Sequence, residues 1–305
     1  MRNCRSIKYV KDLVKRDLTD DVLGKIGNRK SETPTSREHA TAVGVGNGFT
    51  LVELLVVISI LGLLAGLAVP AVKSLGKSNI AVSASRQMLD EAARARQLAM
   101  SRRATVYLVF IPTNFWGNTT WFNALNVNQR DQMTNLLDKQ LTGYSFVSFG
   151  AVGDQPGRHQ WHYIGQWRNL PEGMYLAADK FAKASNQYYT VTNHVTQDIF
   201  NVYGFSTIAI PFPTEDSPTN LLPAIGFNYL GQLSSDGIHM DGRPTYLPLV
   251  RGGVSPAIDP STRQLQLGPA SVSESPAGNG TNAAFNIVAI DPLTGRSTLE
   301  YQRVQ

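Results

Sequence analysis

Glu53 is a charged residue in a part of the sequence where a charge is not expected. It is the only charged residue in a mostly apolar run from Phe49 to Val69. A helix rises about 1.5 Å per residue, so the run would extend roughly 31 Å, close to the hydrocarbon thickness of a bilayer. An acid in such a segment costs free energy unless a cation or the membrane surface compensates it. The run therefore predicts a membrane helix whose carboxylate needs a partner.

Two other clusters have residue types that bind metals. His159 and His162 form an H-x-x-H in strand-like sequence, where residues three apart point to opposite faces, so shared ligation is not expected. Asp236, His239 and Asp241 lie in a glycine-containing loop with the oxygen ligands that Ca²⁺ prefers. Their spacing matches no defined calcium loop and favours a solvated turn. We expect neither a metal nor a cofactor.

No pattern of catalytic residues accompanies these clusters. The sequence has no H-E-x-x-H, G-x-S-x-G, phosphate-binding-loop or zinc-ribbon spacing, so an enzyme is not expected. Arg296 and Arg303 are candidate DNA contacts, preceded in sequence by Arg251 and Arg263. Acidic residues are interspersed among these arginines, and phosphate binding needs clustered cations. Nucleic acid is therefore not expected as a partner.

The stretch Gly48-Phe49-Thr50-Leu51-Val52-Glu53 resembles the processing site of type IV pilins and type II secretion pseudopilins. The resemblance implies cleavage between Gly48 and Phe49 and N-methylation of Phe49. It implies that Glu53 pairs with the N-terminal amine of a neighbouring subunit during assembly, where opposite charges offset part of each other's desolvation. Pro70 also matches the family and implies a helix break near the membrane boundary.

The same resemblance implies a set of partners. They are a prepilin peptidase and methyltransferase, other pilins or pseudopilins in a filament, an inner-membrane assembly platform and an exported protein as cargo. It implies a single-pass protein of the bacterial inner membrane that later enters a filament. A cytoplasmic N-terminus and a periplasmic C-terminal domain follow from the positive-inside tendency, because residues 1–48 hold ten Lys and Arg against six Asp and Glu.

The order of elements predicts an α+β, pilin-like fold, with one long N-terminal helix packed on antiparallel β-sheets. Apolar and small residues recur at helical spacing beyond Pro70, and proline is absent from 71–111. We therefore divide the chain into a cleaved leader (1–48), the transmembrane half of the helix (49–70), its amphipathic half (71–103) and a β-rich extracytoplasmic domain (104–305). Long loops are expected over 113–143, with a short helix around 129–141, and over 252–283. Cys4 is the only cysteine, so no intrachain disulfide is available.

Strands are predicted where β-branched and aromatic residues gather between turn residues. They are expected over 105–111, 144–149, 159–164, 174–178, 202–211, 224–229, 285–290 and 297–302. The last two flank Asp291–Arg296, whose glycine is typical of a hairpin loop.

Several looser features resemble the H-type minor pseudopilins. They are the helix text from Leu89 to Arg96, the stretch Trp167–Gly173, the stretch Ile225–Gly231 and the closing Thr294-Gly-Arg296 turn. The resemblance implies a structural minor subunit of a type II secretion pseudopilus. A minor type IV pilin for adhesion, motility or DNA uptake is the alternative. A free-standing anchored binding protein is a third interpretation, which gives Glu53 no purpose.

Overall fold

The structure is a computed structural model that describes residues 50–150, 159–192, 198–280 and 286–301. Side chains are described throughout these ranges except for 67–79, Asn286 and Tyr301. The chain forms two compact units, Met1–Ile58 and Ser59–Gln305. The predicted leader, with Gly48 and also Phe49, lies outside the described residues.

Helix α1 runs from Leu51 to Arg102, as the single long helix that the sequence predicts. It ends where Arg103 adopts a positive φ of 49° and the amide of Ala104 donates to the carbonyl of Ala99 at 3.3 Å, a left-handed helix stop. Pro70 lies within the helical span, and its side chain is outside the described set, so the predicted break there stays a prediction.

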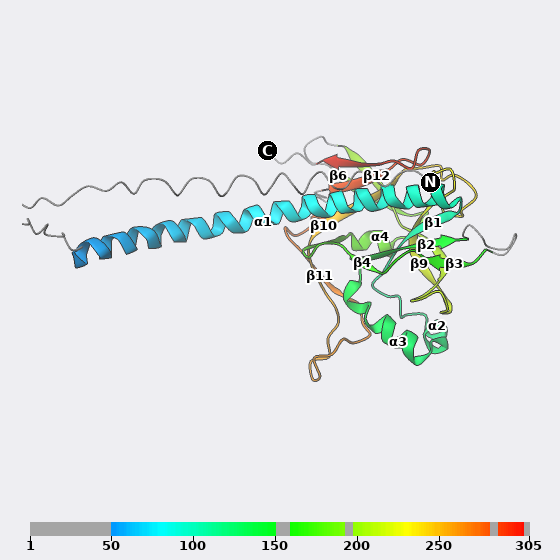
Figure 1. Cartoon of the computed structure of the whole chain (residues 1–305), viewed down its shortest axis with the longest axis horizontal. Coiled ribbons are helices and arrows are strands. Elements are labelled where there is room, and N and C mark those ends of the chain that lie inside the picture. Colours follow the sequence, from blue (N-terminus) through cyan, green and yellow to red (C-terminus); the bar gives the residue numbers. More distant parts are fainter. Residues whose placement is uncertain (1–49, 151–158, 193–197, 281–285, 302–305) are drawn as a thin grey trace, which may run out of the picture. The chain divides into compact units, whose positions relative to one another are not determined.

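The second half of α1 buries a stripe of small residues. Ala84, Met88, Ala92, Ala95 and Ala99 follow one another at spacings of three or four, and each is fully buried. They pack against apolar side chains from β1 (Thr105–Phe110), β9 (Thr219–Phe227), β10 (Thr245–Ser255) and β12 (Asn286–Ile290) in the main hydrophobic core. Figure 1 shows this half of α1 lying along the strands. Alanine lets the helix axis approach the sheets closely, so the helix joins them through one core.

The first sheet is antiparallel, with the order β3-β2-β1-β9-β8 and with β4 also paired to β2. Val106, Leu108 and Phe110 of β1 belong to the core under α1, whereas Tyr107 and Val109 belong to a second core on the opposite face. Burial of both faces explains why the strand is almost continuously apolar. The bounds are β1 (Thr105–Phe110), β2 (Gly143–Phe149), β3 (Trp161–Tyr163), β4 (Arg168–Asn169), β8 (Ser206–Pro211) and β9 (Thr219–Phe227).

The predicted loop over 113–143 holds more helix than expected, although the short helix predicted around 129–141 overlaps α3 (Val127–Thr134). It contains α2 (Thr119–Ala124), α3 and a 3₁₀ turn, Leu137–Lys139. Asn118 caps α2, and Asn126 forms a reciprocal capping box with Gln129 of α3. Polar capping residues made this stretch resemble a loop. Its few apolar side chains cover the second face of the first sheet.

The second sheet has the order β11-β10-β12-β13, with β5 also paired to β10. Its longest strand, β10, is absent from the prediction because Pro248 and the pair Gly252-Gly253 interrupt the strand pattern. The predicted loop over 252–283 is also partly strand, since it holds the end of β10 and all of β11. The β12–β13 hairpin around Asp291–Arg296 is confirmed. The bounds are β5 (Met174–Leu176), β10 (Thr245–Ser255), β11 (Ser271–Glu274), β12 (Asn286–Ile290) and β13 (Ser297–Tyr301).

A separate two-stranded sheet pairs β6 (Tyr188–Thr192) with β7 (Ile199–Tyr203), after the short helix α4 (Ala178–Ala182). The predicted strand over 202–211 is two strands, because β7 ends at Tyr203 and β8 belongs to the first sheet. At the junction, a Cβ on Gly204 would lie 2.0 Å from the carbonyl oxygen of Lys183. Only glycine fits this close approach of two backbones.

Candidate functional site

Glu53 takes part in the N-terminal cap of α1. The backbone amide and the hydroxyl of Thr50 donate to Glu53 Oε2 at 3.1 and 3.0 Å, and the Glu53 amide donates to Thr50 Oγ1 at 3.2 Å. The Leu54 amide donates to the Thr50 carbonyl at 3.1 Å and begins the helix. This arrangement is a capping box, with Thr50 at the N-cap and Glu53 three residues later.

The capping box gives the carboxylate a local role that the sequence interpretation missed. The signal was present as T-x-x-E directly before an apolar run. Thr50 keeps its amide if the chain is cut between Gly48 and Phe49, so cleavage leaves every donor of the cap in place. Within the described residues, both side-chain hydrogen bonds go to Oε2, which leaves Oε1 available to an amine from another chain.

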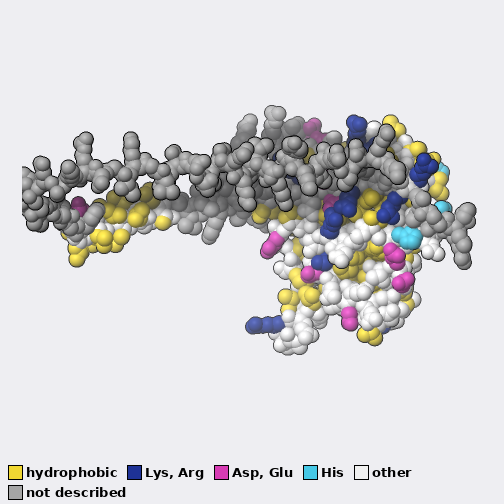
Figure 2. Space-filling model, viewed as in Figure 1, with side chains coloured by type: hydrophobic (Ala, Val, Ile, Leu, Met, Phe, Trp, Pro, Cys, Tyr) yellow, Lys and Arg dark blue, Asp and Glu magenta, His cyan; other side chains and the backbone are white. Residues whose placement is uncertain are grey.

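Apolar side chains at the start of α1 are exposed. Their exposed fractions run from 45% at Val57 to 79% at Leu51, and Figure 2 shows apolar side chains along this part of the helix. The exposed residues are Leu51, Val52, Leu54, Leu55, Val56, Val57, Ile58, Ile60, Leu61, Leu63 and Leu64. An apolar surface of this size on a helix is a surface for lipid or for other helices.

No helix in the part of the chain that the structure describes is both long enough and apolar enough to cross a membrane. The predicted membrane segment over 49–70 includes Phe49 and the side chains of 67–70, which lie outside that part.

Two of the segments that resemble H-type pseudopilins meet at Glu91 of α1. This buried carboxylate accepts a hydrogen bond from Arg168 Nη1 at 2.7 Å and one from the Tyr144 hydroxyl at 3.1 Å. Gln87, one turn earlier, donates to Tyr144 at 2.6 Å and to the Asn169 carbonyl at 2.8 Å. Burial raises the pKa of Tyr144 to about 12, so this hydroxyl remains a donor at neutral pH. The network ties α1 to β2 and β4.

The other two segments meet at Arg96, further along the same helix. Arg96 Nε donates to the Thr294 carbonyl at 2.7 Å. Gly231 and Gly295 both have positive φ, and a Cβ on Gly295 would lie 2.0 Å from the Gly231 carbonyl oxygen. A Cβ on Gly231 would lie 2.9 Å from Met100 Sδ. The two turns therefore require glycine in order to reach α1, and the three segments that lie outside α1 contact it between residues 87 and 100.

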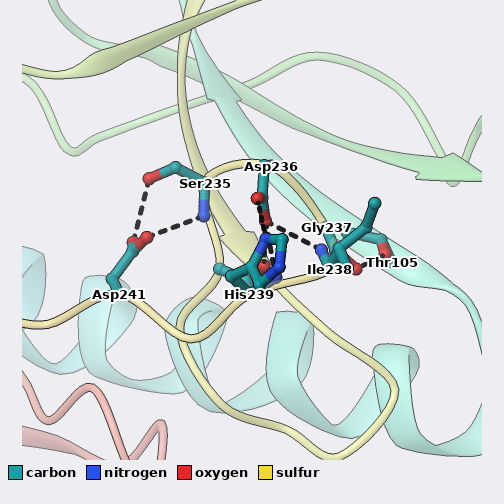
Figure 3. Close-up of polar contacts among 8 residues, drawn as sticks. Thr105, Ser235, Asp236, Gly237, Ile238, His239 and Asp241 are labelled. Carbon is teal, nitrogen blue, oxygen red and sulfur yellow. Dashed lines mark hydrogen bonds and ion pairs between the residues drawn. The ribbon is translucent and has the colours of Figure 1, made fainter.

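The loop around Asp236 and Asp241 is built from hydrogen bonds to its own acids (Figure 3). Asp236 Oδ1 accepts from the amides of Ile238 and His239 at 2.8 and 2.7 Å, and Oδ2 lies 2.7 Å from the His239 ring. Both carboxylate oxygens of Asp241 accept from Ser235. The loop is anchored to β1 because the Thr105 hydroxyl donates to the Gly237 carbonyl at 3.2 Å.

These contacts decide the chemistry of the loop. The His239 ring, followed by the amides of Ile238 and His239, holds the pKa of Asp236 well below its usual range. Each carboxylate oxygen faces donors that belong to the loop, which is the arrangement of an acid-stabilised turn. Among the described residues, no group of three or more His, Cys, Asp or Glu could hold a metal ion.

The histidine pair does not form a shared site. His162 lies in β3 with Nδ1 at 3.8 Å from Glu215 Oε2, whereas the ring of His159 packs 5.4 Å from that of Phe149. The four tryptophans belong to the second core, with Trp121 buried and Trp116, Trp161 and Trp167 partly buried around it. They pack the face covered by α2 and α3.

The candidate DNA-binding arginines lie in different elements. Arg296 is exposed in the β12–β13 turn, Arg251 lies in β10, and Arg263 is exposed in the excursion between β10 and β11. Arg303 lies outside the described residues. The three described arginines come from separate elements, so their placement adds no support for a phosphate-binding patch.

Comparison with known proteins gives one match. Residues 47–69 match the prokaryotic N-terminal methylation motif, and the matched stretch includes Gly48, Phe49 and the Thr50–Glu53 cap. No curated protein and no solved structure matches the chain. The motif implies processing by a prepilin peptidase and membrane-anchored assembly with other pilins into a filament. The motif therefore supports a type IV pilin-like or pseudopilin subunit.

Proposed function

We propose that the chain is a structural minor subunit of a type II secretion pseudopilus, of the H type, that supports protein export. The leader is removed between Gly48 and Phe49, Phe49 is methylated, and the subunit enters the filament through the first half of α1. The single observation that carries the proposal is the match over 47–69, with Glu53 where the family places its acid. The proposal assigns no catalytic reaction and no cofactor to the chain.

The second half of α1 supports the H-type part of the proposal. Of the four segments that resemble this subclass, one is Leu89–Arg96 of α1, and the other three contact α1 around Glu91 or Arg96 although they are far apart in sequence. The resemblance therefore concerns residues that pack together in the folded chain, and not unrelated stretches of sequence. The proposed topology has a single span in the inner membrane, a cytoplasmic N-terminus and a periplasmic domain from residue 104 onward.

Mass spectrometry of the native N-terminus tests the processing step. In cells with a prepilin peptidase, we expect a mature chain that begins with N-methylated Phe49. Replacing Gly48 with valine should leave the leader attached, because the bulky side chain blocks the residue before the cut. Gly46→Val is the matched control, two residues away, and should be processed normally. A wild-type chain that keeps residues 1–48 in such cells would contradict the proposal.

The alternative is a minor type IV pilin for adhesion, motility or DNA uptake. It shares the same cleavage and the same helix, so the N-terminus does not separate the two functions. Neighbouring genes for a secretin, an assembly ATPase and other pseudopilins would favour secretion. Genes for a retraction ATPase and for competence would favour a pilus, and salt-sensitive DNA binding by the full chain would then select uptake.

A further inference from the structure

A cavity of about 370 Å³ lies in the globular unit, beside α4, β7 and the segment that leads into β10. Polar and charged side chains dominate its lining, although most of the molecule's interior is apolar. The residues used below are Lys180, Tyr203, Ser235, Asp241, Arg243 and Tyr246.

Lys180 is a buried cation in the wall of this cavity. Its side chain is on α4, with the residue only 2% exposed, and Nζ donates to the Tyr203 carbonyl at 2.8 Å. Nζ also lies 4.6 Å from the centroid of the Phe205 ring. Among the described residues, no carboxylate forms an ion pair with it. A buried ammonium without an anion is costly, so this arrangement points to a missing negative partner.

Arg243 brings a second cation to the same cavity. Its guanidinium carbon lies 3.8 Å from the centroid of the Tyr203 ring, and Nη2 donates to the Ser185 carbonyl. The stacked ring and this hydrogen bond fix the orientation of the guanidinium plane. A guanidinium held in one plane is prepared for the parallel hydrogen bonds that a carboxylate accepts.

Asp241 offsets only one of the two positive charges, and its oxygens are oriented by hydrogen bonds within its own loop. Both accept hydrogen bonds from Ser235, at 3.0 and 2.9 Å (Figure 3). With Lys180 protonated, the lining holds two cations and one anion, and a single negative charge would balance it. We propose that this cavity binds the carboxylate group of a ligand between Lys180 Nζ and the Arg243 guanidinium. A phosphate dianion would leave an excess of negative charge.

The protonation of Lys180 supports the proposal. Burial, followed by the charge of Arg243, lowers the pKa of Lys180 to about 7. The other ionisable groups that line the cavity are Asp241, Tyr203 and Tyr246. A bound carboxylate favours the protonated amine, so binding should take up a proton above pH 7. Affinity should then fall up to tenfold for each pH unit as the pH rises further, because the amine must take up a proton from the solvent before it can pair with the carboxylate.

Thermal unfolding of the full chain with sodium acetate, compared with sodium chloride at equal ionic strength, tests for the site. We expect acetate to raise Tm in a concentration-dependent way at pH 6.5 and to do so much less at pH 9. Equal effects of the two salts, or an acetate effect that does not change with pH, would overturn the proposal.

A second probe identifies the source of the carboxylate. Acetyl-glycyl-glycine with a free C-terminus should bind, and its C-terminal amide should not bind. Tighter binding of the peptide acid than of acetate indicates a polypeptide terminus as the natural ligand. Equal or weaker binding of the peptide acid indicates a free organic acid. Binding of the amide as well as the acid would overturn the proposal.

Lys180→Met separates the site from general salt effects. Methionine has a similar length without a charge, and replacing a buried cation with an apolar side chain is often tolerated. The variant should keep its fold. It should need at least ten times more acetate than the wild type for the same rise in Tm. Lys183→Met, an exposed position just beyond the same helix, is the matched control and should respond like the wild type. If Lys180→Met does not fold, Arg243→Gln takes its place, and an unchanged acetate response in the folded variant would overturn the proposal.

Discussion

The two halves of α1 show how one helix can carry two kinds of surface. At its start, bulky residues such as Leu51 and Leu61 are 79% and 58% exposed, and apolar side chains lie all round the helix. Between Ala84 and Ala99, four alanines and Met88 form a single buried stripe that the two sheets cover. The second half therefore has its packing partner within the chain. The first half leaves its described apolar side chains exposed, and the proposed function assigns their burial to lipid or to other subunits.

The largest expected effect separates assembly from folding. Glu53→Gln removes the charge but keeps an oxygen that can accept from Thr50, so the helix start should remain capped. We expect incorporation into filaments to fall at least tenfold, because the neighbouring subunit's amine loses its anion, while the globular unit keeps its unfolding temperature. Immunoblots of sheared filaments measure incorporation. Filaments with normal subunit content would contradict the assigned pairing.

Met88→Ala tests the packing of the second half. The side chain is fully buried against the sheets, so its truncation should lower the free energy of unfolding by about 2–5 kcal/mol. Leu61→Ala, in the exposed half, is the control and should change it by no more than about 0.5 kcal/mol. Denaturant unfolding followed by tryptophan fluorescence measures both. An equal loss in the two variants would remove the distinction between the halves.

Glu91→Gln tests the polar tie between α1 and the first sheet. The substitution keeps the shape but removes the charge that Arg168 pairs with at 2.7 Å, and we expect a loss of about 1–3 kcal/mol in the free energy of unfolding. The neighbouring Asp90→Asn change, on an exposed side chain, should stay within about 0.5 kcal/mol. If the two variants have the same free energy of unfolding, the charge of Glu91 does not contribute to stability.

The smallest expected effect lies at the cap itself. Thr50→Val removes the hydroxyl that bonds Glu53, which should destabilise the first turn by about 0.5–2 kcal/mol. Thr50→Ser keeps the hydroxyl and should behave like the wild type. Hydrogen exchange of the amides of residues 51–54 should speed up in the valine variant alone, with the exchange of β1 unchanged. Unaltered exchange in that variant would show that the cap does not hold the helix start.

Much of the local structure could be predicted from the sequence. The processing motif, the long helix to Arg102 and the strands β1, β2, β12 and β13 depend on short-range patterns, which neighbours along the chain determine. The T-x-x-E pattern of the capping box at Thr50 and Glu53 was also present in the sequence. The sequence interpretation gave the acid only an intermolecular role. The predicted loops over 113–143 and 252–283 hold α2, α3 and β11, of which only α3 overlaps a predicted helix, because elements of four to eight residues are too short to show a clear hydrophobic period.

Sequence alone determined where the chain is expected to be cut, which acid stands in the apolar run, and which face of the helix carries small residues. Tertiary structure alone decided that β10 forms despite Pro248, that Arg168 reaches Glu91, and that Lys180 is buried with no ion pair to a carboxylate among the described residues. The physical reason is the range of the interactions. Capping and periodicity act between residues a few positions apart, whereas strand pairing and the burial of a charge depend on segments brought together only by the folded chain.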